Sequence, residues 1–126
     1  MTPEELVKVA SRIAGVFTPS EDCTVGGVAA ALLTAAGNVY TGICIDTACS
    51  LGFCAEHSAI AEMLKAHESD IRLIVAVTTD GAIVPPCGRC RELIRQVSPQ
   101  NAATMIIVGP DRTVPLPDLL PYPWPK

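Results

Sequence analysis

The sequence has few basic residues and no long apolar run. Its 126 residues include 9 Lys and Arg against 13 Asp and Glu, a formal net charge of -4 at pH 7. Binding nucleic acid through a general basic surface needs clustered Lys and Arg, so we expect no nucleic-acid partner. No apolar stretch reaches the roughly 18 residues that span a membrane, and the first ten residues, MTPEELVKVA, lack the order of a secretory signal. We therefore expect no membrane association and a cytoplasmic location.

Apolar residues and cysteine are what the chain has in quantity. Hydrophobic residues make up 49% of it, enough to build a core, and no linker or repeat divides it, so we expect a single domain over residues 1–126. Six cysteines could form three disulfides, but a chain with its own core does not need them, and reduced thiols are favoured. Only Cys87 and Cys90 have the C-x-x-C spacing of metal or redox sites.

The first half of the chain predicts two helices that flank a pair of strands. A capping pattern followed by apolar residues at helical spacing predicts a helix over residues 3–16. The turn signal AAGN divides the apolar segment 24–46 and predicts a hairpin. Apolar residues at helical spacing return over residues 54–68 and predict a second helix.

In the second half, strands alternate with a helix. The apolar runs RLIVAVT (72–78) and TMIIVG (104–109) predict strands, the first of them central and buried on both faces. Between them, residues 88–97 follow a helical pattern. This order implies a mixed sheet with helices on its faces. The proline-rich tail, residues 114–126, can form neither a long helix nor a central strand.

Three cysteines fall at the starts of two predicted helices. Cys54 begins one helix, and Cys87 with Cys90 begins the next. The free N–H groups and positive dipole end of a helix N-terminus favour the thiolate that binds metal. These three thiolates could therefore converge on one zinc ion.

The fourth zinc position separates three interpretations. His57 could complete a Cys₃His structural site. Cys87 and Cys90 could instead form a redox pair, although that would leave Cys54 unused. The catalytic interpretation uses Glu56: three thiolates offset the charge of zinc and make a bound water less acidic, so the site needs a nearby general base. A glutamate two residues after a ligand can face the open position without filling it.

These motifs resemble those of a known family. CAE (54–56) followed by PCGRC (86–90) resembles the zinc nucleoside deaminase signature, [H/C]-x-E then P-C-x-x-C. CAEHSAI and PCGRCRELI are similar to the small cytidine deaminases, and SEDCTVGGVAAAL, PCGRCR and LLPYPW are similar to the blasticidin S deaminase branch. The resemblance extends from about residue 20 to residue 124. It implies a three-layer α/β/α sandwich around a five-stranded mixed sheet, usually assembled as a homotetramer.

The resemblance also implies roles at the site. Cys54, Cys87 and Cys90 would bind one zinc per chain, and Glu56 would act as the proton shuttle. The shuttle would carry protons to ring nitrogen N3 and then to the amine that leaves C4. The implied reaction converts a cytosine nucleoside to its uracil counterpart and ammonia.

Two groups of positions depart from the typical cytidine deaminase. Where that enzyme holds the ribose with asparagine and glutamate, this chain has Cys44 and Asp46, and only the aspartate is a good hydrogen-bond acceptor. Trp124 in the tail could supply an aromatic wall to the substrate pocket, in the chain's own site or a neighbour's.

The charge around the zinc is a second departure. Where an arginine commonly follows CAE, this chain has His57. Arg89 and Arg91 are the candidates to supply the missing positive charge. Glu92 stands where the family often has glutamine, and Phe53 is expected to be a core residue beside the site.

The sequence thus favours a zinc-dependent hydrolytic deaminase that acts on cytidine or deoxycytidine. One alternative is the deamination of blasticidin S or another aminopyrimidine, favoured by the altered sugar-binding positions. The other alternative is a non-catalytic Cys₃His zinc domain.

Overall fold

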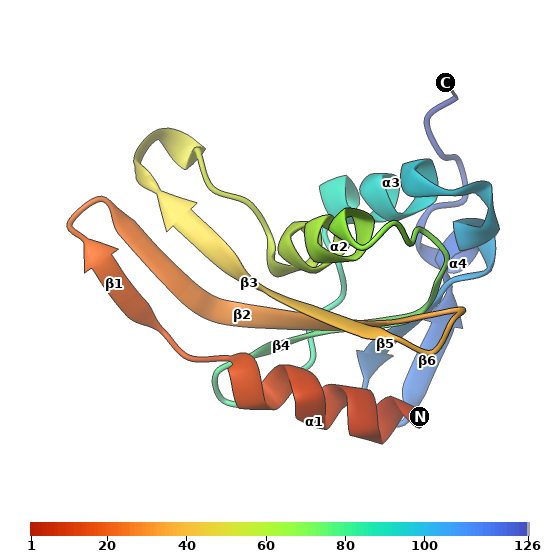
Figure 1. Ribbon diagram of the computed structural model, residues 1–126, viewed down its shortest axis with the longest axis horizontal. Helices are drawn as coiled ribbons and strands as arrows, with labels where there is room; N and C mark the ends of the chain where they lie inside the picture. The colour runs from red at the N-terminus through yellow and green to blue at the C-terminus, as the bar shows by residue number, and fades with distance from the viewer. Residues whose placement is uncertain (126) are drawn as a thin grey trace.

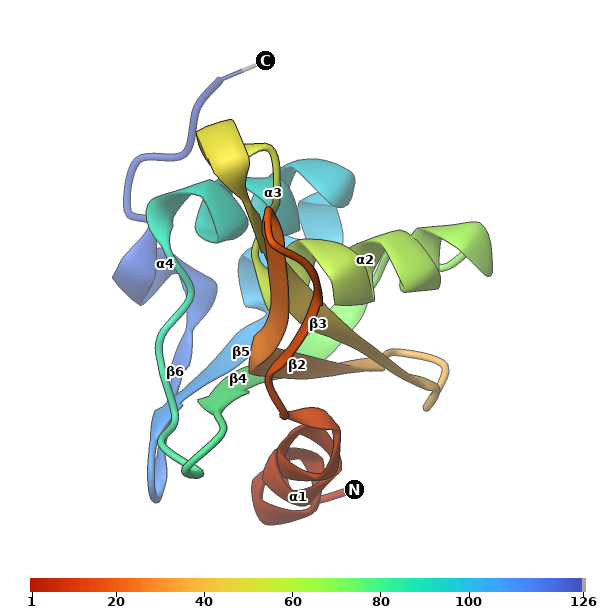
Figure 2. The same cartoon turned by 90° about the vertical axis from the view of Figure 1, so that its left-hand side faces the viewer.

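The computed structural model describes residues 1–125, which form one mixed sheet with helices on both faces (Figure 1). Helix α1 covers one face, and α2 and α3 cover the other, as the turned view also shows (Figure 2). This is the expected three-layer α/β/α arrangement. The elements follow the order α1 (Pro3–Ile13), β1 (Phe17–Ser20), β2 (Cys23–Thr34), β3 (Val39–Thr47), η1 (Ala48–Ser50), α2 (Ala55–Lys65), β4 (Ile71–Thr78), α3 (Gly88–Val97), η2 (Pro99–Ala103), β5 (Met105–Gly109), β6 (Arg112–Pro115) and α4 (Leu116–Leu119).

The sheet has six strands where five were expected. Five of them form the order β3-β2-β4-β5-β6, in which only β4 and β5 pair in parallel. The additional strand, β1, pairs with the first part of β2, whereas β4 pairs with the later part of the same strand from Val28 onward. Because β2 is 12 residues long, it has room for both neighbours. The extra strand therefore extends the five-stranded arrangement without interrupting it.

Helix α1 packs on one face of the sheet. The hydroxyl of Thr2 accepts a hydrogen bond from the N–H of Glu5 at 3.2 Å, which is the predicted N-terminal cap. The helix ends at Ile13 rather than at residue 16, because Ala14 already has extended backbone angles. Leu6 and Ala10 are fully buried against β2, β4 and β5.

The opposite face holds the larger core. Ile60 and Met63 of α2 and Ile94 of α3 pack there against Ile74 of β4 and Ile106 of β5. Strand β4 contributes to the cores on both faces, which confirms the prediction of a central strand. Among residues 1–125, no helix has the length and apolarity that crossing a membrane requires.

Two glycines allow the backbone of β3 to approach its neighbours closely. A Cβ atom at Gly42 would overlap the start of α2 at Ser58 and Ala59. A Cβ atom at Gly52 would overlap the carbonyl of Ile45. These contacts hold α2 and the segment before it tightly against β3, and they thereby set the position of the first turn of α2.

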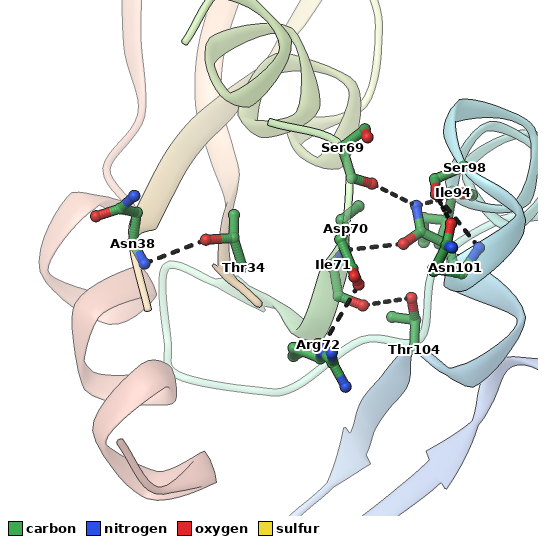
Figure 3. Close-up of polar contacts among 11 residues, drawn as sticks. Thr34, Asn38, Ser69, Asp70, Ile71, Arg72, Ile94, Ser98, Asn101 and Thr104 are labelled. Carbon is green, nitrogen blue, oxygen red and sulfur yellow. Dashed lines mark hydrogen bonds and ion pairs between the residues drawn. The ribbon is translucent and has the colours of Figure 1, made fainter. Parts of the chain in front are cut away.

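A buried polar network joins η2 to the sheet and to α3 (Figure 3). We call it the Asn101 network. The amide of Asn101 accepts from the N–H of Ile71 at 2.8 Å and donates to the carbonyls of Ser69 at 3.0 Å and Ile94 at 2.9 Å. The hydroxyl of Thr104 donates to the carbonyl of Ile71 at 2.6 Å. Because Asn101 and Thr104 are fully buried, these bonds satisfy groups that water cannot reach.

Candidate active site and metal centre

Two helix N-termini bring three thiols together. Cys54 is the N-cap residue of α2 and Cys87 is the N-cap residue of α3, while Cys90 lies in the first turn of α3. The Sγ atoms of Cys54 and Cys87 are 3.6 Å apart, and those of Cys87 and Cys90 are 3.5 Å apart. The structure therefore brings the three predicted zinc ligands together across 33 residues of chain.

The spacing of these sulfur atoms suits a zinc ion. Thiolates that bind a tetrahedral zinc at about 2.3 Å lie about 3.8 Å from one another. The observed 3.5 and 3.6 Å are close to that value, so an ion would fit with little movement of the side chains. All six cysteines are free thiols, which leaves these three available for a metal.

The charges at the cluster also call for a cation. Burial and a hydrogen bond with Cys87 raise the pKa of the Cys54 thiol, and burial together with the charge of Glu56 raises that of Cys90 more strongly. Burial also acts upward on Cys87, but hydrogen bonds from the backbone and the thiol of Cys90 outweigh it and lower its pKa. Acidic groups this close together cannot all ionise without a compensating positive charge. A dication supplies that charge and converts the thiols to ligands.

His57 lies beside the thiols as a fourth nitrogen or sulfur donor. Its Nδ1 is 3.4 Å from the Sγ of Cys90, and the donor atoms of Cys54, His57 and Cys90 all lie within 4.8 Å of one another. Burial, and then the charge of Arg89, lower the pKa of His57 and favour a neutral ring. By distance alone, two donor sets share Cys54 and Cys90: one is completed by His57 and the other by Cys87. Distance does not separate the two sets, because the 3.4 Å contact of His57 with Cys90 is as short as the sulfur–sulfur contacts of 3.5 and 3.6 Å.

Glu56 is the one buried carboxylate among residues 1–125. It is the second residue of α2 and is 5% exposed, and it lines the cavity beside the thiols. Burial raises the pKa of its carboxyl group, and this effect outweighs the hydrogen bonds from its own backbone and from Cys90. A raised pKa makes the protonated carboxyl easier to form, which suits a group that must both accept and return a proton.

A cavity of about 470 Å³ opens above the cluster, between β3, α2 and the loop before α3. This volume is within the range of small-molecule sites. Its wall includes Cys54, Glu56 and Cys87, and it also includes the predicted sugar-side positions Cys44 and Asp46.

The two sugar-side residues differ in exposure. Cys44 is 8% exposed, and its sulfur accepts the backbone N–H of Val28 at 3.3 Å. Asp46 is exposed at the rim of the cavity. A weak contact of 3.8 Å joins the Cys44 thiol to the Asp46 carboxylate. Asp46 is thus the residue of the pair whose acceptor atoms face solvent.

The two predicted arginines lie in different places. Arg89 is exposed and lines the cavity, and its positive charge contributes to the lowered pKa of His57. Arg91 donates to two main-chain carbonyls, those of Pro86 at 2.8 Å and Leu119 at 3.1 Å. It therefore fastens the loop before Cys87 and helix α4 to α3.

Trp124 lies outside the residues that line this cavity. Its side chain is 72% exposed, and its backbone N–H donates to both carboxylate oxygens of Glu92, at 3.1 and 3.2 Å. These contacts give Glu92 a structural task, because it holds the tail against α3.

Sequence reasoning missed several residues of the cavity wall. Phe53 was expected in the core, but it is 37% exposed and lines the cavity. Thr47 also lines it, and the buried hydroxyl of Thr47 has no hydrogen-bond partner among residues 1–125. The position of Phe53 next to a ligand in the sequence was the available signal. The sequence held no comparable signal for Thr47, because the burial of its hydroxyl depends on the fold.

An α/β/α sandwich with three clustered thiols and a buried glutamate at one cavity is the arrangement expected of a zinc-dependent hydrolase. Residues 2–106 match the family described as the cytidine and deoxycytidylate deaminase zinc-binding region, and the chain belongs to this family. It is accordingly a hydrolase that acts on a carbon–nitrogen bond and uses one zinc per chain.

Individual relatives agree with the family assignment. The chain is 30% identical over 110 residues to a cytidine deaminase of Halalkalibacterium halodurans, which covers 85% of this chain and 81% of the relative. The crystal structure of the Mycobacterium tuberculosis cytidine deaminase superposes with a TM-score of 0.83 at 26% identity and covers 100% and 99% of the two chains. The cytidine deaminase of Burkholderia pseudomallei gives a TM-score of 0.74 at 29% identity, with coverage of 98% and 100%.

Proposed function

We propose that the protein deaminates a cytosine nucleoside, with cytidine or deoxycytidine as the substrate and uridine or deoxyuridine plus ammonia as the products. The observation that carries this proposal is the buried carboxylate of Glu56 beside the three thiols, inside a cavity of nucleoside scale. The curated relatives named cytidine deaminase support the choice of substrate.

In this proposal Cys54, Cys87 and Cys90 hold the zinc. Bound there, zinc supplies a Lewis acid that makes water a nucleophile near neutral pH. With these three residues as its protein ligands, a bound zinc would have a place for that water, as catalytic zinc sites do. The exposed guanidinium of Arg89 offsets part of the negative charge at this cluster. For Arg91 we propose an indirect part, in which it holds the Cys87 loop through Pro86.

Glu56 moves the protons. It takes a proton from the attacking water and gives it to N3 of the ring. It then takes a second proton, from the hydroxyl formed at C4, and gives it to the amine as the C4–N bond breaks and the carbonyl forms. The raised pKa of its buried carboxyl group supports both directions of transfer, because a strongly acidic carboxyl would not return the proton.

Recognition of the sugar falls to Asp46 in this proposal. Its exposed carboxylate can accept hydrogen bonds from sugar hydroxyls at the rim of the cavity. Cys44, whose sulfur already accepts the N–H of Val28, shapes the wall. We also propose that Trp124, which is exposed in its own chain, contributes to the site of a neighbouring subunit.

The sugar side also carries a second candidate substrate. Position 44 holds a cysteine and so offers no amide to a sugar hydroxyl. The polar side chain that is left on this side of the cavity is the anionic carboxylate of Asp46. A carboxylate pairs with a cationic substituent as readily as with a hydroxyl. Blasticidin S or another aminopyrimidine with a charged substituent is therefore the alternative substrate.

Ultraviolet assays with cytidine, deoxycytidine and blasticidin S test this choice. We expect turnover of cytidine or deoxycytidine, and a KM about ten-fold higher in Asp46→Ala because a hydrogen bond to a charged group is lost. Cys44→Ala is the matched control on the same strand and should raise KM less. Turnover of blasticidin S alone would select the alternative substrate, and turnover of none of the three would refute the proposal.

The wider biology follows from the same proposal. We propose one catalytic domain over residues 1–126 that assembles as a homotetramer in the cytoplasm, works in pyrimidine salvage, and has neither a nucleic-acid nor a membrane partner. The net charge of -4 supports the absence of nucleic acid. Light scattering tests the assembly, because a monomer would exclude both the tetramer and a contribution of Trp124 across subunits.

A further inference from the structure

Phe53 is anchored to the sheet although it lies outside the regular strands. Its backbone N–H donates to the carbonyl of Ile45, and its carbonyl accepts the N–H of Ile45, both at 3.0 Å. The preceding residue, Gly52, lies so close to Ile45 that a side chain there would overlap the strand. The ring of Phe53 therefore starts from a fixed backbone, directly before the ligand Cys54.

The ring of Phe53 faces the imidazole of His57. Their centroids are 6.3 Å apart and their planes differ by 18°. Aromatic pairs attract each other at centroid separations of roughly 4.5–7 Å. Four residues separate the two, which places His57 one turn further along the chain, within α2. The stack therefore favours one orientation of the imidazole plane.

The imidazole of His57 also has a polar contact with Cys90. The Nδ1 atom of His57 lies 3.4 Å from the Sγ of Cys90, a distance that suits an N–H···S hydrogen bond. Cys90 is the fully buried member of the three thiols, so its thiolate has the greatest need of a donor. A hydrogen bond to a metal ligand from the surrounding protein orients that ligand and tunes the metal.

We propose that Phe53 is a positioning residue, which holds His57 so that its Nδ1–H donates to the Cys90 thiolate while His57 itself stays outside the zinc coordination. This inference rests on the assignment of Cys90 as a zinc ligand in the proposed function. In this arrangement the ring of Phe53 and the imidazole of His57 together help the protein to retain the zinc. Keeping His57 off the zinc preserves the open position that hydrolysis requires.

Zinc release to a chromogenic chelator, 4-(2-pyridylazo)resorcinol, tests the link between the two rings. We expect Phe53→Leu and His57→Ala each to release zinc about ten-fold faster than wild type, because loss of a partner of a metal ligand weakens metal binding by that order. The double variant should release zinc no faster than His57→Ala, since Phe53 acts through His57. Phe53→Tyr keeps the ring and should release zinc at the wild-type rate. Phe17→Leu, which removes the other phenylalanine, is the matched control and should also match wild type.

Two kinetic outcomes would overturn the proposal. In one, Phe53→Leu releases zinc at the wild-type rate. In the other, the effects of Phe53→Leu and His57→Ala multiply in the double variant, which would show that each residue acts alone. Circular dichroism of each zinc-loaded variant identifies any that fail to fold.

A measurement on the unmodified protein keeps the proposal testable even if Phe53→Leu does not fold. Nitrogen-15 spectra of the zinc-loaded protein with labelled histidine should show His57 protonated at Nδ1, with His57→Ala identifying its signals against those of His67. An Nδ1 without a proton, or one bound to the metal, would contradict the proposed hydrogen bond. Neither measurement uses turnover, so a protein that passes both but ignores cytidine would overturn the substrate assignment alone.

Discussion

Two polar clusters in this fold, the buried Asn101 network and the partly buried thiol cluster of Cys54, Glu56, Cys87 and Cys90, are built in opposite ways. In the Asn101 network, neutral side chains meet main-chain groups, and each buried amide atom of Asn101 has a partner. In the thiol cluster, acidic side chains meet one another. Burial raises the pKa values of Cys54, Glu56 and Cys90, and repulsion from neighbouring acidic groups raises those of the two thiols further. The first cluster is complete in the protein alone. The second holds acidic groups without a compensating charge, so we expect it to need a cation, as a catalytic site would.

The largest effect should follow from breaking the thiol cluster. Cys90→Ser replaces a soft thiolate with a hydroxyl, which is a poor zinc ligand. We expect the variant to lose zinc and to lose turnover by more than about 10³-fold, because the metal-activated nucleophile disappears. Zinc content by mass spectrometry and the ultraviolet assay measure the two effects. A Cys90→Ser protein that retains one zinc and full turnover would remove Cys90 from the site.

Breaking the Asn101 network should have the reverse profile. Asn101→Ala leaves the N–H of Ile71 and the carbonyls of Ser69 and Ile94 buried without their partner. Each such group costs about 1–3 kcal/mol, so we expect the free energy of unfolding to fall by about 3 kcal/mol, measured by urea denaturation. The folded protein should still bind one zinc.

Gln100→Ala is the control for this second variant, because the neighbouring amide is exposed. We expect it to change the free energy of unfolding by no more than about 0.5 kcal/mol. A loss of zinc in folded Asn101→Ala protein would show that the thiol cluster depends on the Asn101 network, and would contradict the view that the two clusters are independent.

The smallest effect on stability should come from a third, partly exposed polar contact near the surface. Glu68 accepts hydrogen bonds from Tyr40 and from Asn38, the latter at 2.8 Å. Hydrogen bonds from Thr34, Tyr40 and Asn38 lower the pKa of Glu68 below its model-peptide value of 4.5. The stabilisation is therefore fully present above pH 4.5 and is lost as the pH falls through the lower pKa of the folded state.

Urea denaturation across the acid range measures this dependence. Glu68→Gln carries no titrating group, so its unfolding free energy should fall less steeply below pH 4.5 than that of wild type. Tyr40→Phe removes one donor and should shift the curve in the same direction, by less. Identical acid curves for wild type and Glu68→Gln would show that this exposed contact contributes nothing.

The parts of the molecule that could be predicted are those encoded in local spacing. Helix periodicity located α2 and α3, and the positions of Cys54 and Cys87 at their starts follow from that periodicity. The convergence of the two helix N-termini is a property of the sheet topology. The places of the cysteines at helix starts suggested it, and the family resemblance implied the ligand roles. Burial of strand β4 on both faces was readable because its apolar run is continuous.

The parts that could not be predicted depend on contacts between distant segments. Strand β1 is four residues long, includes a proline, and is exposed throughout, so it has no apolar pattern to reveal it. Glu92 holds the backbone of Trp124 from 32 residues away, and a main-chain partner leaves no trace in the side-chain sequence. The place of Phe53 on the cavity wall likewise depends on its pairing with Ile45 of β3.

The most direct test of the catalytic account compares wild type with Glu56→Gln for zinc content and turnover in the same preparations. The substitution keeps the size of the side chain and removes its ability to carry a proton. We predict about one zinc per chain in both proteins, and a fall in turnover of about 10²–10⁴-fold in the variant, because the proton shuttle is gone. Full turnover in Glu56→Gln, or a loss of zinc together with activity, would contradict the role assigned to Glu56.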